Sequence, residues 1–307
     1  MVLCVGAAAY DLFFPLAGWL EENRKYQIAF SRESGGGPAA NAAYLLSRWG
    51  VGAALACVLG DDLYGRRIRE EFREAGTDLR LTETRAGAAT PLSVILVNTA
   101  NGSRTLVNRL APAEPLRFGP EALESLAALR PEVLLFDGHQ PEAALQAMSL
   151  FPEARTILDA GSRRRGTELL ATRVEFLVPS EAFARAMTGE QDLGSEAGRR
   201  RCLHALAALN RREVVVTLGE RGVLYLEKGE VRHLPAFPVR AVDTTGAGDI
   251  FHGAFAYGVL QGWALAEVVR FAAMTAALSV TRPGARASIP ELAEVCAALS
   301  ATAASAG

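Results

Sequence analysis

Short, fully apolar segments alternate along this chain with longer segments in which apolar residues recur at helical spacing. The short segments are predicted to be strands, at residues 2–5, 53–59, 133–136, 156–158, 176–178 and 214–216. Helices are predicted between them, including residues 38–49, with Pro38 in the first turn, and residues 63–75. Strands that are apolar on both faces are typical of a sheet covered by helices on both sides. The pattern therefore predicts an α/β fold, a doubly wound, mostly parallel sheet with ligands binding beyond the carboxyl ends of its strands.

Two segments interrupt this alternation. Residues 12–34 show no helical period, and residues 91–109 have the pattern of a hairpin, with strands at 92–98 and 104–108 and a turn at Asn101-Gly102. Together they predict a small second β-sheet, a lid formed by about 12–34 and 90–110, which also offers a surface for a homodimer. The chain shows no internal repeat and no low-complexity linker, so residues 1–307 are interpreted as a single domain.

Composition and charge limit the class of protein. The 307 residues are 50% hydrophobic, which is enough to bury a sizeable core. A formal net charge of −2 argues against nucleic acid or an anionic membrane as the main partner. Residues 2–20 lack a basic start and contain Asp11, so they are interpreted as a strand and loop rather than a signal sequence. The four cysteines form no Cys-x-x-Cys pair and are predicted to be reduced, buried thiols of a cytoplasmic protein: Cys4, Cys57, Cys202 and Cys296.

The segment with the clearest chemistry is Asp243-Thr244-Thr245-Gly246-Ala247-Gly248-Asp249, directly before a strongly helical run at 250–261. Small residues at a helix N-terminus leave backbone N–H groups open to a ligand, and the helix dipole adds partial positive charge. Gly246, Ala247 and Gly248 are therefore expected to form an anion hole for a transferring phosphoryl group. Asp249 is placed to take a proton from a substrate hydroxyl. The alternative is a glycine-rich helix start whose aspartate serves only as a cap.

Residues 243–262 resemble the C-terminal motif of the ribokinase-like (PfkB) carbohydrate kinases. Three further segments resemble motifs of this family in the same order: Gly35-Gly36-Gly37-Pro38-Ala39-Ala40-Asn41, Val216-Thr217-Leu218-Gly219-Glu220-Arg221-Gly222, and Thr281-Arg282-Pro283-Gly284-Ala285 followed by Ser288-Ile289-Pro290. The resemblance covers nearly the full chain. It implies a ribokinase-like fold and an ATP-dependent carbohydrate kinase that phosphorylates a sugar hydroxyl.

The resemblance also implies roles for individual residues. Asp249 matches the catalytic base of the family, and Asp11 stands where the family places a carboxylate that binds sugar hydroxyls. Further contacts to the sugar are implied for Gly36, Gly37 and Asn41. On the nucleotide side, Thr217 and Gly219 are expected to meet ATP, with Gly222 in a tight turn. A K⁺ ion is implied beside Asp243 and Thr245, together with Ala285 and Ser288 of the closing loop.

One segment departs from the family pattern. After the strand at 176–178, many members carry Asn-x-x-Glu, which helps to organise Mg²⁺ and phosphate. This chain has Ser180-Glu181-Ala182-Phe183, so both polar positions of the motif are replaced. We expect either that Glu181 compensates or that Mg²⁺ is held through waters and ATP.

The choice of sugar depends on a few positions. The runs 35–40 and 279–284 look most like those of the ketohexokinase and sulfofructose kinase branches. The resemblance implies that a sulfonate would meet a Lys and an Asn from the lid, for which Lys25 and Asn108 are candidates. It also implies an Arg near a central strand end, where this chain has Gly138 or His139. His139 follows a strand's carboxyl end and is also a candidate substrate contact. We therefore expect a neutral ketose or pentose, such as fructose or ribose.

Other functions remain as alternatives. A sulfofructose or other acidic-sugar kinase and a nucleoside kinase would use the same scaffold, although the lid lacks an obvious aromatic clamp for a base. The replaced Asn-x-x-Glu motif also allows a nucleotide- or sugar-binding protein without catalysis. A dinucleotide-dependent dehydrogenase is disfavoured, because Gly6-Ala7-Ala8-Ala9-Tyr10-Asp11 lacks the Gly-x-Gly-x-x-Gly turn.

Overall fold

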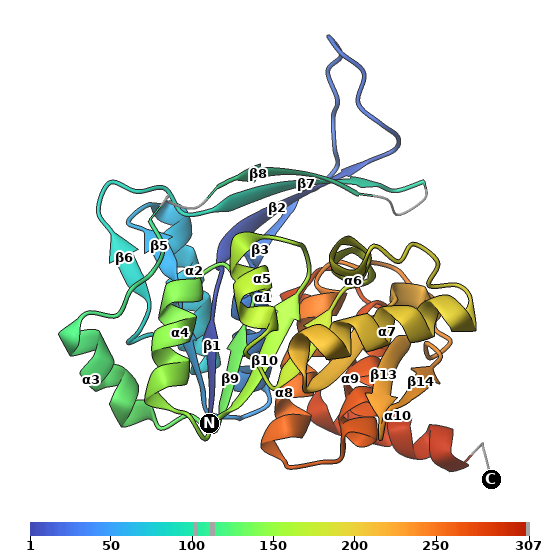
Figure 1. Ribbon diagram of the computed structural model, residues 1–307. Coiled ribbons are helices and arrows are strands. Elements are labelled where there is room, and N and C mark those ends of the chain that lie inside the picture. Colours follow the sequence, from blue (N-terminus) through green and yellow to red (C-terminus); the bar gives the residue numbers. More distant parts are fainter. Residues whose placement is uncertain (101–103, 111–113, 305–307) are drawn as a thin grey trace.

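The computed structural model describes residues 1–100, 104–110 and 114–304, and its largest sheet within these ranges has eight strands (Figure 1). Its strands lie in the order β14 (Glu230–Leu234), β13 (Val223–Glu227), β12 (Glu213–Thr217), β11 (Phe176–Pro179), β10 (Arg155–Ala160), β9 (Val133–Phe136), β1 (Val2–Val5) and β4 (Ala53–Ala56). Strands β12 to β4 pair in parallel, and β13 and β14 add an antiparallel edge. The predicted mostly parallel sheet is confirmed.

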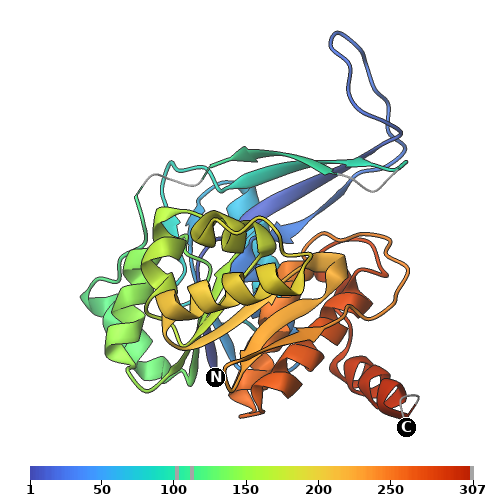
Figure 2. The same ribbon diagram turned by 45° about the vertical axis from the view of Figure 1, so that its right-hand side comes forward.

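Helices cover both faces of this sheet, as Figures 1 and 2 show. Alternate residues of each strand enter different cores: Val2 and Cys4 pack on one face, Leu3 and Val5 on the other. The first face is covered by α1 (Pro38–Arg48), α2 (Leu63–Ala75), α8 (Ala247–Leu260), α9 (Leu265–Ser279) and α10 (Leu292–Ala304). The second face is covered by α3 (Pro120–Leu129), α4 (Pro141–Leu150), α5 (Arg165–Ala171), α6 (Glu181–Thr188) and α7 (Glu196–Asn210).

A second, smaller sheet lies beyond the carboxyl ends of the central strands (Figure 1). Its order is β3 (Arg32–Gly36), β2 (Ala9–Leu16), β7 (Leu92–Asn98) and β8 (Arg104–Arg109). We call it the lid sheet. The predicted turn at Asn101-Gly102 lies outside the described residues. Residues 17–31 form an extended arm between β2 and β3 that rises away from the main sheet in both views (Figures 1 and 2).

Two local predictions were wrong. The apolar run at 53–59 is not one strand, because it leaves the main sheet after Ala56. Its second half, β5 (Val58–Gly60), pairs instead with β6 (Glu83–Arg85) in a separate two-stranded sheet. The four cysteines are free, but Cys296 is exposed on α10 while the other three are buried. In the described ranges, no helix has the length and hydropathy needed to cross a membrane.

Candidate active site

The residues singled out by sequence lie mainly where the main sheet meets the lid sheet. Asp159 ends the apolar run of β10, Ser180 follows β11, and Thr217 ends β12, so the carboxyl ends of three neighbouring strands contribute polar side chains. Asp11 lies on β2 of the lid sheet, directly after β1. This edge is where ligands bind in open α/β sheets.

Helix α8 begins three residues earlier than the sequence pattern suggested. Gly246 precedes the helix with φ of 74°, a left-handed conformation that glycine adopts without a steric penalty. A Cβ at this position would also overlap Ala285 of the closing loop. A Cβ on Gly248 would meet nothing within 4 Å, so the space beside the first turn is open. The first N–H groups of α8 have no intrahelical acceptor and can receive an anion here.

Asp249 lies in the first turn of α8 and is held from α1. The Asn41 side chain, which is 3% exposed, donates from Nδ2 to Asp249 Oδ2 at 2.7 Å. Burial and the nearby charge of Asp159 raise the pKa of Asp249 to about 7, while the Asn41 hydrogen bond opposes the rise. A carboxyl group with such a pKa is poised to exchange a proton near neutral pH.

Two residues lie behind Asp249, and sequence reasoning did not assign them a role at the site. His252, one turn further along α8, contacts the Gly248 carbonyl through Nδ1 at 2.7 Å and the Val178 carbonyl through Nε2 at 2.9 Å. Its Nδ1 also lies 3.1 Å from Asp159 Oδ2, and both side chains are almost fully buried. The sequence could have indicated Asp159, because it is the one charged residue in the buried part of β10.

Asp11 lies in a row of polar side chains across the lid sheet. The pairing register places Ser34, Asp11, Ser93 and Asn108 side by side on β3, β2, β7 and β8, so the four share one face. Asp11 is 8% exposed, and burial raises its pKa although a hydrogen bond with Ser93 opposes this. A Cβ on Gly36 would overlap the Asp11 carboxylate, so the glycine makes room for it. Asn108 is exposed, and Lys25 is an exposed residue of the arm.

We call the set Asp11, Asn41, Asp159 and Asp249 the acidic wall. Gly37 helps to position Asn41 of this wall. It directly precedes α1 with φ of 98°, and its backbone lies against Ala7. Behind Asn41, Arg286 of the closing loop donates from Nε to Asn41 Oδ1 at 3.0 Å and forms an ion pair with Glu71 of α2. The sequence analysis did not identify Arg286 or Glu71, because 215 residues separate them along the chain.

Asp137 and His139 directly follow β9, at the carboxyl end of that strand. Asp137 accepts backbone N–H groups of Ala7 at 2.8 Å, Ala39 at 3.2 Å and His139 at 2.9 Å. Although burial favours its neutral form, His139 and these donors hold its pKa at about 2. Asp137 thus ties β1, α1 and β9 together. The His139 ring lies 3.1 Å from Asp137 and 2.8 Å from Arg164 Nη1, and it is partly exposed.

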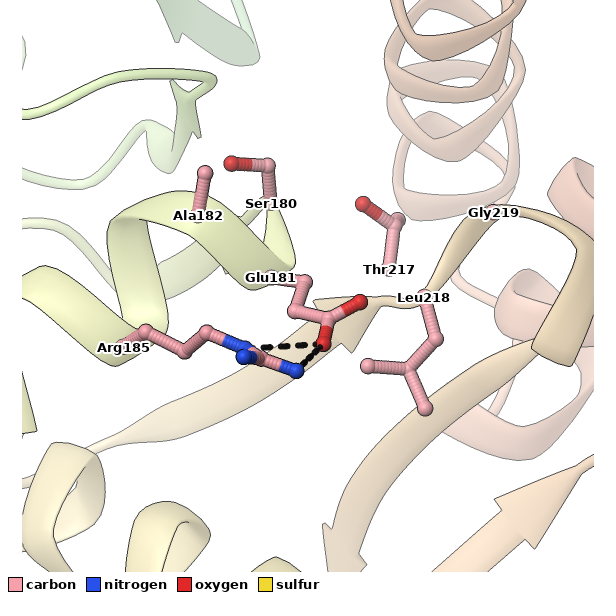
Figure 3. A pocket seen from close by; sticks show the side chains of 7 residues that line it. All are labelled: Ser180, Glu181, Ala182, Arg185, Thr217, Leu218 and Gly219. Carbon is pink, nitrogen blue, oxygen red and sulfur yellow. Dashed lines mark hydrogen bonds and ion pairs between the residues drawn. The ribbon is translucent and has the colours of Figure 1, made fainter. Parts of the chain in front are cut away.

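The nucleotide-side segment borders a shallow cavity of about 450 Å³, which we call the open pocket (Figure 3). It is lined by Ser180, Glu181, Ala182, Arg185, Thr217, Leu218 and Gly219. Thr217 and Gly219 therefore lie together at one cavity. Gly222 lies behind it, with φ of 92° and no room for a Cβ beside the Leu234 carbonyl, as its expected role in a turn requires.

The replaced Asn-x-x-Glu positions do not offer metal ligands. Ser180 caps α6 by accepting the Phe183 N–H at 3.2 Å, and Phe183 is fully buried. Glu181 is held by ion pairs to Arg185 and Arg221, as Figure 3 shows for Arg185. Burial would raise the pKa of Glu181, but the two arginines lower it. Within the described part of the chain, no three His, Cys, Asp or Glu side chains are arranged to hold a metal ion.

Asp243 connects the loop before α8 to the closing loop. It accepts the Thr245 N–H through Oδ1 and the Gly284 N–H through Oδ2, both at 2.9 Å. Burial opposes its ionisation, but these hydrogen bonds lower its pKa. Arg104 of the lid strand β8 reaches the same loop and donates to Thr245 Oγ1 at 2.9 Å. In the closing loop, Ser288 donates to the Ala285 carbonyl at 2.9 Å.

Comparison with known proteins places this arrangement in a family. The pfkB family carbohydrate kinase profile matches residues 1–292. Ribokinase from Bacillus subtilis is 30% identical over 85% of this chain and 86% of that protein, and fructokinase-1 from Zea mays is 28% identical over 87% and 88%. The structure of ribokinase from Arabidopsis thaliana, complexed with ribose and ATP, superposes with a TM-score of 0.82 at 24% identity, covering 96% of this chain and 97% of that one.

The chain belongs to the pfkB family of carbohydrate kinases. It is a sugar kinase, and the predicted ribokinase-like fold is confirmed.

Proposed function

We propose that this carbohydrate kinase transfers the γ-phosphoryl group of ATP to a hydroxyl of a neutral ketose or pentose, with Asp249 as the general base. The observation that carries the proposal is the placement of Asp249 at the open first turn of α8, hydrogen-bonded to Asn41 at 2.7 Å and with its pKa raised to about 7. General-base assistance of this kind contributes about 10²–10⁴-fold to the rate.

The acidic wall binds the sugar and accepts its proton, and the first turn of α8 stabilises the transferring phosphoryl group. Asp11 accepts hydrogen bonds from sugar hydroxyls, and Asn41 holds Oδ2 of Asp249 so that Oδ1 faces the reacting hydroxyl. Asp249 takes the hydroxyl proton as the new oxygen–phosphorus bond forms, and the leaving group is ADP. The N–H groups at Gly246, Ala247 and Gly248 stabilise the charge on the transferring group. Bound ATP supplies that group, and Mg²⁺ neutralises part of its charge.

The residues at the α8 N-terminus and the open pocket are suited to bind ATP, whereas they offer few ligands for a metal ion held by the protein alone. We assign the phosphates to the α8 N-terminus and the remainder of the nucleotide to the open pocket, beside Thr217 and Gly219. Glu181 is already paired with two arginines, so Mg²⁺ would enter with the nucleotide phosphates rather than be held by Glu181. The ribokinase from Arabidopsis thaliana was solved with ribose and ATP, which supports ATP as the phosphoryl donor.

The polar row of the lid sheet favours a neutral sugar. Asp11 lies between two serines, so the row offers oxygen acceptors for hydroxyl donors and contains no cationic side chain for an anionic substituent. The relatives named above, a ribokinase and a fructokinase, act on such sugars by name. One observation favours the acidic-sugar alternative: Arg164 reaches His139, close to where an arginine would meet a sulfonate.

The test is Asp249→Asn in an assay coupled to ADP release, with D-ribose, D-fructose, 2-deoxy-D-ribose, adenosine and 6-sulfo-D-fructose as acceptors. We expect one neutral sugar to give the highest kcat/KM and the variant to lose at least about 10²-fold in kcat. Asp61→Asn is the matched control, because Asp61 is exposed and accepts the Gly87 N–H, which asparagine also can. Near-native turnover by Asp249→Asn would contradict the proposed role of Asp249 as the general base. Binding of ATP and sugar with no ADP release in the wild type would favour a binding protein instead.

A K⁺ site is proposed next to Asp243 and Thr245, where the closing loop adds the Ala285 carbonyl and Ser288. Asp243 keeps its negative charge there, because hydrogen bonds lower its pKa. We expect kcat to rise when KCl replaces tetramethylammonium chloride at equal ionic strength. An identical rate in both salts would contradict a K⁺ requirement.

We also propose that residues 1–307 act as one kinase domain whose lid sheet mediates a homodimer. Among the described residues, strand β8 is an edge strand of the lid sheet and is exposed along its whole length, and Leu106, Val107 and Leu110 present apolar side chains there. Val107→Lys is expected to lower the mass measured by light scattering from dimer to monomer. Leu150→Lys, an exposed leucine at the end of α4, is the control. A monomeric wild type would rule the dimer out.

A further inference from the structure

Arg286 connects four elements that are distant in sequence. It lies in the short 3-10 turn Arg286–Ser288 of the closing loop and is 4% exposed. Its guanidinium forms an ion pair with Glu71 of α2 and donates from Nε to Asn41 Oδ1 of α1 at 3.0 Å. Asn41 in turn donates to Asp249 of α8. Glu71 also accepts the Gly35 N–H at 3.0 Å, so β3 joins the same network.

The chemistry of these groups dictates the orientation of the Asn41 amide. A guanidinium has only donors, so the Asn41 atom that faces Arg286 must be the carbonyl oxygen. The amide nitrogen must then face Asp249 and donate to it. Without Arg286, the two ends of the amide could exchange, which would place a carbonyl oxygen against a carboxylate oxygen.

We propose that Arg286 is a positioning residue that fixes the Asn41 amide and, through it, the carboxylate of Asp249. The inference rests on the proposed function, in which Asp249 accepts the proton of the sugar hydroxyl. Arg286 itself lies behind Asn41 and is not a catalytic residue. Its effect is to keep Asp249 Oδ2 occupied by an N–H donor, which leaves Oδ1 for the substrate.

The surroundings of Arg286 indicate that its buried positive charge does not serve to stabilise the fold. Its Nη2 is buried and has no hydrogen-bond partner among the residues the structure describes, and an unpaired buried donor is unfavourable. The Tyr44 and Phe72 rings lie 4.9 and 4.6 Å from the guanidinium carbon and offset part of this cost. Gly35 has no side chain where the guanidinium lies, since a Cβ there would overlap it.

The orientation of Asn41 has a consequence for titration. The titratable groups near Asp249 are Asp159 of β10, Asp11 of β2 and His252 of α8, and the two aspartates favour its neutral form. The Asn41 N–H is the hydrogen bond that favours the ionised form. Loss of this donor therefore raises the pKa of Asp249, and the protonated form, which cannot act as a base, persists to higher pH.

The experiment compares Arg286→Met and Arg286→Lys with Arg201→Met as the matched control, because Arg201 is an exposed arginine of α7 whose ion pair with Glu190 lies outside this network. The pKa of Asp249 is measured by NMR of ¹³C-labelled aspartate, with the signal assigned from Asp249→Asn. The probe for turnover is D-ribose with MgATP. We expect Arg286→Met to raise the pKa by about one unit and to lower kcat by about 10–10²-fold, with a nearly unchanged KM for ATP. Arg286→Lys, which keeps a donor, falls between it and the wild type.

A double-mutant cycle separates positioning from a general structural effect. If Arg286 acts through Asn41, Arg286→Met has no further effect on the pKa of Asp249 in an Asn41→Ala background. Additive effects in the cycle overturn the inference, as does an unchanged pKa of Asp249 in Arg286→Lys and Arg286→Met. If Arg286→Met does not fold, the pKa in Arg286→Lys decides alone. The proposed function fails separately, through full activity of Asp249→Asn.

Discussion

The acidic wall and the open pocket both include residues at the carboxyl ends of main-sheet strands, but they are built in opposite ways. In the acidic wall, Asp11, Asn41 and Asp159 are each less than 9% exposed, and contacts between distant segments fix their orientation. In the open pocket, Ser180 and Glu181 are occupied by a helix cap and by ion pairs, and Ala182 and Gly219 of the lining carry no polar side chain. Proton transfer needs a fixed geometry, whereas a nucleotide can be bound through backbone groups whose side chains vary.

This difference predicts that substitutions in the acidic wall change turnover strongly, while substitutions in the open pocket change stability or affinity modestly. It also accounts for the replaced Asn-x-x-Glu positions. Ser180 and Phe183 serve the local fold of α6, and in our proposal the phosphates bind elsewhere, at the start of α8.

After Asp249→Asn, the largest effect is expected from Gly36→Ala. The added methyl group would overlap the Asp11 carboxylate and displace it from the sugar hydroxyls. We expect kcat/KM for the sugar to fall by about 10²-fold while KM for ATP changes little. Steady-state kinetics with both substrates measure this. Gly18→Ala is the control, because a Cβ there meets nothing within 4 Å. An unchanged kcat/KM would mean that Asp11 does not hold the sugar.

The pH dependence of kcat tests the acidic wall next. The pKa of Asp249 is raised to about 7, and the base must be ionised to accept a proton. We therefore expect kcat to be at its maximum above about pH 8 and to fall about tenfold per pH unit well below 7. Rates from pH 5.5 to 9 at saturating substrates measure the acid limb. A flat profile between pH 6 and 8 contradicts this assignment.

A smaller effect concerns stability. Because the pKa of Asp249 is raised on folding, the folded state binds its proton more tightly than the unfolded chain, whose aspartates have a pKa of about 3.9. Stability contributed by the protonated form is thus present at low pH and lost as pH rises through about 7. We expect Asp249→Asn to unfold a few degrees higher than the wild type at pH 8. The difference disappears near pH 4. Calorimetry at both values measures it, and a lower unfolding temperature at pH 8 is the contrary result.

The smallest effect is expected in the open pocket. Ser180→Ala removes the α6 cap, which accepts the Phe183 N–H, and should cost about 0.5–2 kcal/mol in the free energy of unfolding. Turnover at saturating MgATP should stay within a few-fold of the wild type. Ser180→Asn keeps a capping acceptor and is the matched control. Urea unfolding and kcat measure both. A collapse of kcat in Ser180→Ala would mean that the open pocket is as tightly coupled to the chemistry as the acidic wall.

The sequence by itself predicted the sheet, the helices on both faces and the helix start that presents Asp249. These features depend on neighbouring residues: apolar runs, the period of helical segments and small residues before a helix. The hairpin strands β7 and β8 were predicted for the same reason, within one residue of their ends. The run 53–59 was misjudged, because pairing of β5 with β6 depends on a partner 25 residues away.

Only the tertiary structure decided which residues surround Asp249. Asn41 is 208 residues from Asp249 and Arg286 is 245 residues from Asn41, so no local pattern relates them. Likewise, a glycine is required at position 36 only because β3 pairs with β2 and brings the Asp11 carboxylate beside it. The physical reason is that backbone preferences are set within a few residues, whereas burial and electrostatics are set by whatever the packed chain brings together.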